Sequence, residues 1–451
     1  MSQVRWHTLA RATAGIVPAI RPKNASFPPK TGPGTQHAWG PVMRLPFTLS
    51  SLGLLSSLLL ALPACSGPAP DATNPGGDGG TGKTTTNPRS PQRNVNPIAP
   101  AADIATLVSG NTTFATALHT HLAAQAGNLF YSPYTISLNM AEVDASGSQP
   151  TVATALHFTL PPAKLNPAFD ALDLDLTSLE GKTSTGQGDQ FLEASAAWGT
   201  LATPGGAVST LEQYYGADVL TGKDPGAAVQ TWEGASSPGP ELPVALIGAC
   251  DGFIASLVNF DAAWETAFDP SATQPGTFTR AGGSTVSVPI MSQEVVLSVH
   301  AGGATPAVEI PYDGGRLSML VVIPSDLTLF EASLDPSAID AIEHSLSPAN
   351  VQLGLPKFSF TAGWSVLPVL EKMGLALGGG GEWNVSHVAE IKVSETGTQA
   401  SATSATSHSP SAAAPATQFQ VDRPFVFFIR DTKTGTVLFI GRIVDPTVTH
   451  G

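Results

Sequence analysis

Cysteine is nearly absent from this chain, and charged residues are scarce. The 451 residues include 2 cysteines, and 12% of the residues are charged. Two cysteines exclude a disulfide scaffold, a four-thiolate zinc site and an iron–sulfur site. The formal net charge of -14 argues against a nucleic-acid partner, because such a protein needs a basic surface to meet the phosphates. Hydrophobic residues make up 42% of the chain, which is enough for a large buried core.

Acidic residues are missing from residues 1–65, although this stretch contains six Lys or Arg. From Met43, a short basic start leads into an uncharged, leucine-rich run that ends at Leu62. This order is typical of a secretory signal peptide, and the run is too short to span a bilayer, which takes about 20 residues. Residues 43–65 therefore predict a signal peptide. Residues 1–42 are either an unusually long leader or the product of a mis-assigned start codon.

The predicted signal peptide ends in Leu62-Pro63-Ala64-Cys65, which resembles the cleavage box of a bacterial lipoprotein. That resemblance implies lipidation of Cys65, and the alternative is ordinary secretion with cleavage nearby. Either route places the mature chain outside the cytoplasm, secreted or anchored by lipid to a bacterial membrane. Residues 66–100 are rich in Gly, Pro, Thr, Asn and Ser and predict a flexible tether, since they cannot bury enough surface to offset the entropy of ordering. One folded domain, 101–451, follows.

The pattern of this domain predicts an α+β fold, with helices early and strands late. Residues 103–124 show apolar positions at helical spacing, and Ser132-Pro133 marks a second helix start, with Ser as the N-cap. Strand-like apolar runs bounded by turn residues come later. They cover Val286–Met291, Val308–Ile310, Leu317–Ile323, Val351–Leu355, Phe425–Ile429 and Val437–Ile440.

The common catalytic and cofactor motifs are missing. The sequence has no Gly-x-Ser-x-Gly elbow, phosphate-binding loop or His-Glu-x-x-His helix, so we expect neither an enzyme nor a cofactor. His119 and His121 lie two apart on a predicted helix and face different ways, which argues against a metal pair. We interpret Asp170, Asp173 and Asp175 as a solvated face rather than a metal site.

One long stretch lacks large apolar residues altogether. Between Val393 and Phe419 the chain contains small and polar residues, two strand-like segments flank it, and a loop of that length inside a compact domain is usually functional or disordered. Composition alone leaves both readings open, a functional loop and a degenerate linker.

Three segments lie around this loop: His387–Ala400 before it, and Phe419–Asp431 and Thr434–Arg442 after it. The two later segments resemble the closing signature of the serpins, and His387–Ala400 resembles the strand and hinge before the reactive loop of that family. Weaker matches in the same order are Asn128–Ser137, Trp264, Phe268–Pro270, Val288–Met291 and Glu309–Tyr312. The resemblance covers roughly residues 103–446. It implies a serpin-like fold, in which early helices pack on large mixed or antiparallel β-sheets and a reactive loop is exposed.

The resemblance also implies a mechanism, because serpins are suicide substrates that trap a serine protease when the cleaved loop enters the main sheet. In serpins, loop insertion adds a strand to the sheet and releases stored strain. The residues that match the hinge are Glu395, Gly397, Thr398, Gln399, Ala400 and Ala402. The side chains that must become buried are small and uncharged, which favours insertion. The alternative is a non-inhibitory serpin-fold protein that is cleaved or binds a partner.

Some positions depart from the family pattern. Ser256 stands at the usual buried Asn, Ser394 at another Asn, and Thr396 and Gln399 where the hinge usually has Glu. These departures predict a less stable centre of the main sheet within the same fold. Beneath the sheet, the resemblance implies a hydrogen-bonded cluster of Ser132, Thr135 and His387. A buried core histidine without that role is the alternative for His387.

Family spacing from Glu395 places the reactive bond at Ser411-Ala412. The segment before Phe425 is about two residues longer than usual, so Ala412-Ala413 and Ala413-Ala414 stay open as alternatives. Ser or Ala at this position predicts a protease with a small apolar specificity pocket, elastase-like or subtilisin-like. A trypsin-like target is not expected, because no Lys or Arg lies between Lys392 and Arg423.

Overall fold

The structure is a computed structural model that describes residues 92–147, 150–179, 190–199, 206–221, 223–236, 251–377, 383–398 and 415–450. Cys65, the predicted leader, the signal peptide and most of the tether lie outside the described residues. Within these ranges no helix is both long and apolar enough to cross a bilayer.

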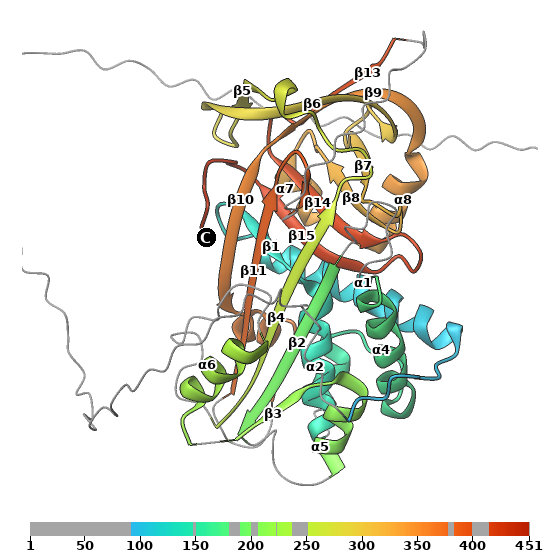
Figure 1. Ribbon diagram of the computed structural model, residues 1–451, viewed down its shortest axis with the longest axis vertical. Helices are drawn as coiled ribbons and strands as arrows, with labels where there is room; N and C mark the ends of the chain where they lie inside the picture. The colour runs from blue at the N-terminus through green and yellow to red at the C-terminus, as the bar shows by residue number, and fades with distance from the viewer. Residues whose placement is uncertain are drawn as a thin grey trace, which may run out of the picture. The chain divides into compact units, whose positions relative to one another are not determined.

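The main sheet contains several long strands that run side by side in Figure 1. Strands β11 and β4 are parallel and β10 is antiparallel to β11, whereas β2 is antiparallel to β4 and parallel to β3. In spatial order the strands are β10 Phe358–Ser365, β11 Trp383–Val393, β12 Gly397–Thr398, β4 Gly252–Ala263, β2 Gln190–Gly199 and β3 Asp218–Leu220.

A second sheet of nine described strands packs against one end of the first. Except for β1, its strands come from the second half of the chain, and they pair antiparallel apart from the parallel pair β13 and β9. In spatial order it contains β1 Leu129–Tyr131, β15 Val437–Ile443, β14 Phe425–Asp431, β8 Leu317–Val322, β7 Ala307–Pro311, β6 Thr285–His300, β9 Ser347–Pro356 and β13 Thr417–Gln420, with β5 Gln274–Thr279 paired to β6.

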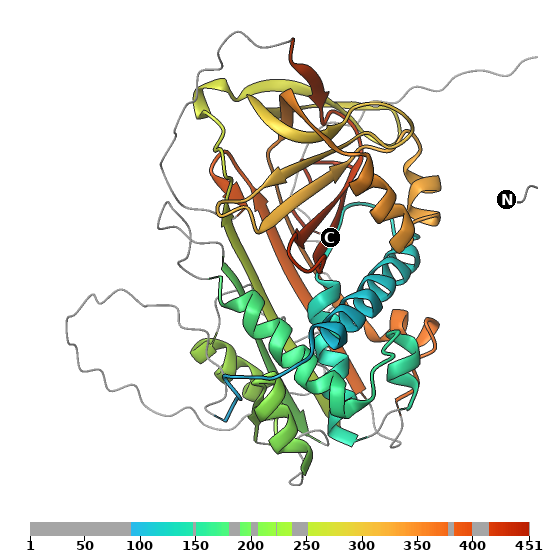
Figure 2. The same ribbon diagram turned by 90° about the vertical axis from the view of Figure 1, so that its right-hand side faces the viewer.

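Helices cover the main sheet from both faces. Helices α1, α2 and α4 gather on one face, as Figure 2 shows, while Val229 and Trp232 of α6 pack on the other. The described helices are α1 Ala101–Leu122, α2 Pro133–Gly147, α3 Pro150–Ala155, α4 Pro162–Thr177, α5 Gly206–Thr210, the π-helical turn η2 Leu211–Tyr215, α6 Pro225–Ser236, the 3-10 turn η4 Pro270–Ala272, α7 Leu327–Ala332, α8 Pro336–Ser345 and α9 Leu367–Lys372.

Aromatic side chains join the two sheets. The Phe439 ring of β15 lies 6.0 Å from that of Phe191 on β2 and 5.7 Å from that of Phe260 on β4, measured between ring centroids. It also stacks on Phe130 at 5.2 Å. Gly441 follows on the same strand, and a Cβ there would collide with the ring of Phe427. The main sheet is therefore fixed to the second sheet at this end through a continuous aromatic core.

The predicted α+β class is confirmed, and each predicted strand run coincides with a strand, except that the run Leu317–Ile323 extends one residue past the end of β8 at Val322. The helix predicted over 103–124 runs over Ala101–Leu122, and Ser132 caps α2, because its Oγ accepts a hydrogen bond from the Thr135 N–H at 3.1 Å. The predicted order of helices then strands is incomplete. The long strands β2 and β4 come early, and α7, α8 and α9 lie between late strands.

Two sequence interpretations are wrong. Arg93, placed in the predicted tether, is 7% exposed and packs against the helices, so the ordered domain begins before residue 101. Asp170 and Asp173, interpreted as a solvated face, are 0% and 1% exposed. Both carboxylates pair with Arg93, at 3.0 Å and 2.7 Å respectively. Only Asp175 of that group is partly exposed, and it pairs with Arg316.

His119 is a structural residue in the described domain. Its Nδ1 lies 2.9 Å from the Tyr131 hydroxyl and its Nε2 lies 3.0 Å from Glu331 Oε1. His121 is exposed on the same helix. Among the described residues, no group of three or more His, Cys, Asp or Glu could hold a metal ion.

Candidate functional site at the hinge of the main sheet

The hinge leaves β11 at Val393, turns, and re-enters the sheet as the two-residue strand β12. Thr398 pairs with Val393 of β11 on one side and with Ala262 of β4 on the other. Backbone hydrogen bonds hold the turn, with Trp264 N–H donating to the Thr396 carbonyl at 3.0 Å. Gly397 is needed here, since a Cβ would collide with the Ala262 carbonyl oxygen. The start of the hinge is therefore already a strand of the main sheet.

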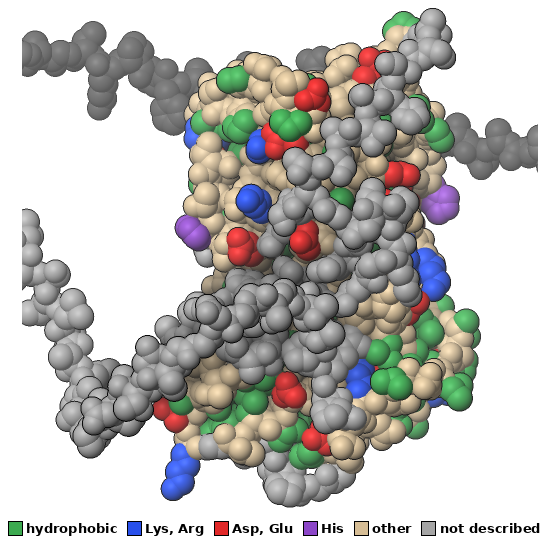
Figure 3. Space-filling view, in the orientation of Figure 1, with side chains coloured by type: hydrophobic (Ala, Val, Ile, Leu, Met, Phe, Trp, Pro, Cys, Tyr) green, Lys and Arg blue, Asp and Glu red, His purple; other side chains and the backbone are tan. Residues whose placement is uncertain are grey.

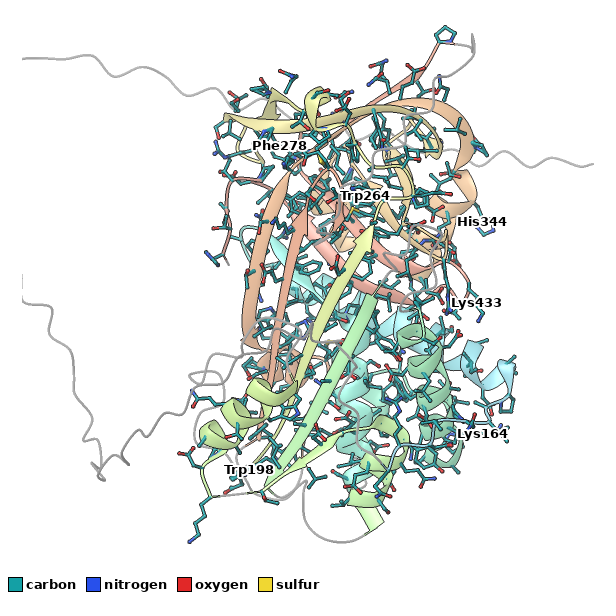
Figure 4. The ribbon with its side chains drawn as sticks, viewed as in Figure 1. Lys164, Trp198, Trp264, Phe278, His344 and Lys433 are labelled. Atoms are coloured by element: carbon teal, nitrogen blue, oxygen red, sulfur yellow. The ribbon has the colours of Figure 1, made fainter. Side chains whose placement is uncertain are left out.

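Thr398 is buried in this position, with 1% of its surface exposed. Its hydroxyl is hydrogen-bonded to the Tyr312 hydroxyl at 2.8 Å. Tyr312 stacks on Trp264, at 4.7 Å between ring centroids, and Trp264 Nε1 donates to the Ser394 carbonyl at 2.9 Å. Figure 4 shows Trp264 at one end of β4, with Trp198 near the opposite end of the sheet. An aromatic platform thus supports the first inserted side chain.

An ion pair fixes the turn from outside the sheet. Lys357 Nζ lies 2.7 Å and 2.9 Å from the two carboxylate oxygens of Glu395, and the Thr273 hydroxyl donates to the same carboxylate at 2.8 Å. Burial alone would raise the pKa of Glu395, but the hydrogen bonds from Lys357 and Thr273 hold it below its usual range. Glu395 is therefore ionised at neutral pH and ties the hinge to the strand β10 side of the molecule.

Below the hinge, the two central strands separate. Strands β11 and β4 pair directly from Trp383 with Gly252 up to Val388 with Leu257. Over the described residues 389–392 and 258–261 the two strands share no direct ladder. The interval lies between the closed end of the sheet and the Thr398 pair. A strand that continued from Thr398 in the same register would fill it.

The residues of the predicted cluster beneath the sheet come together. Ser132 N–H donates to His387 Nε2 at 3.0 Å, and Ser132 Oγ lies 2.9 Å from Thr135 Oγ1. Ser132 Oγ also donates to the Leu438 carbonyl of β15 at 2.8 Å. Burial lowers the pKa of His387 to about 4, so the ring is neutral at physiological pH. Its Nδ1 has no hydrogen-bond partner among the described residues.

The sequence reasoning missed two polar residues of this buried layer. Asn139 of α2 donates to Ser256 Oγ at 2.8 Å, so a helix supplies the amide beside the serine that departs from the family pattern. One turn further on, Glu142 accepts from Ser195 Oγ of β2 at 2.6 Å, and burial raises its pKa to about 8. The signal was their i, i+3 spacing on a helix whose other residues are mostly apolar.

Several predicted site residues lie outside the described residues. Of the hinge, Glu395, Gly397 and Thr398 are described, whereas Gln399, Ala400 and Ala402 are not. The same holds for the three candidate reactive bonds between Ser411 and Ala414, and for Cys65.

Comparison with known proteins shows which fold the chain shares and which family its second half is similar to. The sequence model described as "Serpin (serine protease inhibitor)" matches residues 251–377 and 383–446. This segment of the chain is therefore similar to the serpins. An uncharacterized serpin-like protein of Thermococcus kodakarensis is 34% identical over 211 residues, which are 43% of this chain and 49% of that protein. Human glia-derived nexin is 34% identical over 221 residues, 43% of this chain and 54% of that protein.

The matched segment thus spans about half the length of these curated relatives. Among solved structures, human thyroxine-binding globulin complexed with thyroxine aligns with a TM-score of 0.66 at 22% identity, over 77% of this chain and 100% of that one. The thermophilic serpin tengpin in its native state aligns with a TM-score of 0.65 at 19% identity, over 78% of this chain and 97% of that one. These alignments establish the serpin fold across the described domain.

Proposed function

We propose that this chain inhibits a serine protease as a suicide substrate. The observation that supports this most strongly is the position of Thr398, which already occupies the first place of an inserted strand between β11 and β4. Cleavage of the loop would leave the protease attached as an acyl-enzyme. Insertion of the rest of the hinge would then carry the protease across the sheet before the ester is hydrolysed.

The sequence of the hinge supports insertion on energetic grounds. Thr398 faces the core, so alternate positions after it, Ala400, Ala402 and Ser404, would face the core in a continued strand. Each is small and uncharged, and the first proline of the loop is Pro410, so neither burial of charge nor a missing backbone donor opposes the added strand. The interval between β11 and β4 is where this strand would form.

The protease we propose has a small, apolar specificity pocket of the elastase-like or subtilisin-like kind. This proposal rests on Ser411-Ala412 and its neighbouring alternatives, and on the lack of Lys and Arg between Lys392 and Arg423. We further propose that the chain acts outside the cytoplasm, secreted or tethered through a lipid on Cys65. The membrane would contribute only through that anchor.

Inhibition is tested by measuring whether the chain forms a covalent complex with the protease. The chain should form a complex with pancreatic elastase or subtilisin that survives denaturing electrophoresis, whereas trypsin should form none. Mass spectrometry of the released C-terminal peptide should place the bond between Pro410 and Ala414. Cleavage in that window with no complex would favour the alternative, a serpin-fold protein that is cut or binds a partner without trapping. The fold alone does not decide, since a thyroxine-binding globulin shares it.

A further inference from the structure

Residues 92–100, called the strap here, contain a turn and bends over 92–96 and lead into α1 at Ala101. Its Arg93 is 7% exposed and inserts among the helices. The guanidinium contacts Asp170 Oδ1 at 3.0 Å and Asp173 Oδ2 at 2.7 Å, both on α4. It also donates to the Tyr215 carbonyl of η2 at 3.2 Å. One side chain of the strap therefore clamps two helical elements behind the main sheet.

The clamp neutralises a buried acidic group. Asp170 and Asp173 are 0% and 1% exposed, and the Tyr134 hydroxyl lies 3.4 Å from Asp173 Oδ1. Burial alone would lower the pKa of Arg93, but Asp173 and Asp170 hold it above its usual value. Removing one partner of such a buried pair leaves uncompensated charge and is strongly destabilising. The ordered helices therefore depend on a residue that lies in the strap.

Beyond Arg93 the strap is partly open to solvent, with Pro97 and Ala99 half-buried and Ala99 packed against the core. Val95 is 72% exposed and Ile98 is 91% exposed, although both are apolar. The last contact of the backbone near Arg93 is the Asn94 N–H, which donates to the Gln213 carbonyl at 2.9 Å. Among the described residues, the backbone of 97–99 makes no hydrogen bond to the body of the domain. This is the extended, unpaired backbone that proteases bind by strand addition.

The local sequence also fits the protease class proposed above. Pro97-Ile98-Ala99 places an aliphatic residue after proline and before alanine, and Pro410-Ser411-Ala412 of the predicted reactive loop has the same frame. A protease with a small apolar pocket would therefore accept both. This step rests on the proposed function, because the protease class comes from the loop.

We propose that Ile98-Ala99 is a processing site at which a protease of small apolar specificity releases the strap. Water adds across the peptide bond, leaving a carboxylate on Ile98 and an amine on Ala99. Arg93 then belongs to a separate fragment, which is held by the ion pairs of Arg93 and by the hydrogen bonds to Tyr215 and Gln213. When these contacts break, Pro97 leaves with the fragment and opens one wall of a cavity of about 530 Å³ that Ile104 also lines.

The cleavage test uses the full chain and pancreatic elastase in slight molar excess. Mass spectrometry of the domain fragment should show a new N-terminus at Ala99, and size-exclusion chromatography should separate the fragment that ends at Ile98. Ile98→Glu should reduce this cut at least about tenfold, because the pocket rejects a carboxylate, while the cut between Pro410 and Ala414 persists. The matched control Val95→Glu should leave the Ala99 terminus in place.

The clamp is tested without cleavage. Arg93→Met should lower the melting temperature of the intact chain by at least about 5 °C. Replacing both partners, in the variant with Asp170→Asn and Asp173→Asn added to Arg93→Met, should restore part of that loss. Recovery in the triple variant separates the buried charge from a general packing defect.

Three results would overturn the proposal. They are N-termini confined to positions upstream of Arg93, a cut at Ala99 that Ile98→Glu leaves unchanged, and a melting temperature that Arg93→Met does not lower. Failure of the proposed function looks different. In that case the loop is cut and no covalent complex forms, while the Ala99 terminus still appears.

Discussion

Thr398→Arg is the substitution that distinguishes insertion from mere cleavage. The wild-type side chain is 1% exposed between Ala262 and Val393. Keeping an arginine there would bury an unpaired charge at a cost of about 3–5 kcal/mol. Withdrawing the hinge instead forfeits the hydrogen bond to Tyr312, worth about 1 kcal/mol, and two residues of strand pairing. Withdrawal is cheaper, so the intact variant should fold with a modest loss of stability.

After cleavage the hinge cannot stay withdrawn if the loop is to insert, because the arginine must enter the sheet ahead of the residues that follow it. A barrier raised by about 3–5 kcal/mol slows insertion by about two to four powers of ten. Hydrolysis of the acyl-enzyme should then be faster than insertion. The stoichiometry of inhibition against elastase should rise steeply, while the cleavage site stays the same. Thr398→Ser, which keeps the hydroxyl, should behave as wild type. An unchanged stoichiometry in the arginine variant would refute the reasoning.

Two further predictions concern the charges around the sheet. Burial raises the pKa of Glu142 to about 8, so between about pH 4.5 and 8 the folded state holds a proton that the unfolded state has released. The contribution of Glu142 to stability should therefore be lost as the pH rises from about 4.5 through 8. Glu142→Gln should remove this loss, seen by urea unfolding at pH 5, 7 and 9, and parallel pH profiles would contradict it. Lys357→Ala should lower the free energy of unfolding by about 1 kcal/mol at pH 7. The reason is that Lys357 lowers the pKa of Glu395 in the folded state, which stabilises the fold at pH values above the usual pKa of a glutamate. This stabilisation is lost as the pH falls through the lowered pKa of Glu395. The loss should disappear near pH 3 and be absent in Lys357→Arg, and an equal loss at both pH values would count against the ion pair.

The sequence predicted the parts of the site that depend on local pattern. The closing strands, the hinge turn at Gly397 and the cap at Ser132 each carry their signal within a few residues. Arg93 carries no such local signal, because its partner Asp170 lies 77 residues away and its neighbours in the sequence have the composition of a linker. For the same reason the two aspartates looked like a solvated face, because nothing near them in the sequence supplies a cation.

The pairing of the hinge strand is the second feature that the sequence did not show. The pattern of small residues indicated that Thr398 would be among the first side chains buried in the sheet, but it could not show that the pairing already exists in the intact chain. That depends on contacts with β4 and Tyr312, which are distant in sequence. The sequence likewise did not predict that Asn139 and Glu142 point inward, because a polar residue on a helix is usually exposed. Their role is seen only from their hydrogen bonds to Ser256 and Ser195 on the strands.

The central claim, that the cleaved loop becomes a strand of the main sheet, is tested most directly by thermal unfolding of the chain before and after cleavage between Pro410 and Ala414. Insertion should raise the melting temperature of the cleaved form by at least about 10 °C, which corresponds to a few kcal/mol for a domain of this size. Cleaved Thr398→Arg should show no such rise. A cleaved wild-type chain that melts at or below the temperature of the intact chain would contradict the account.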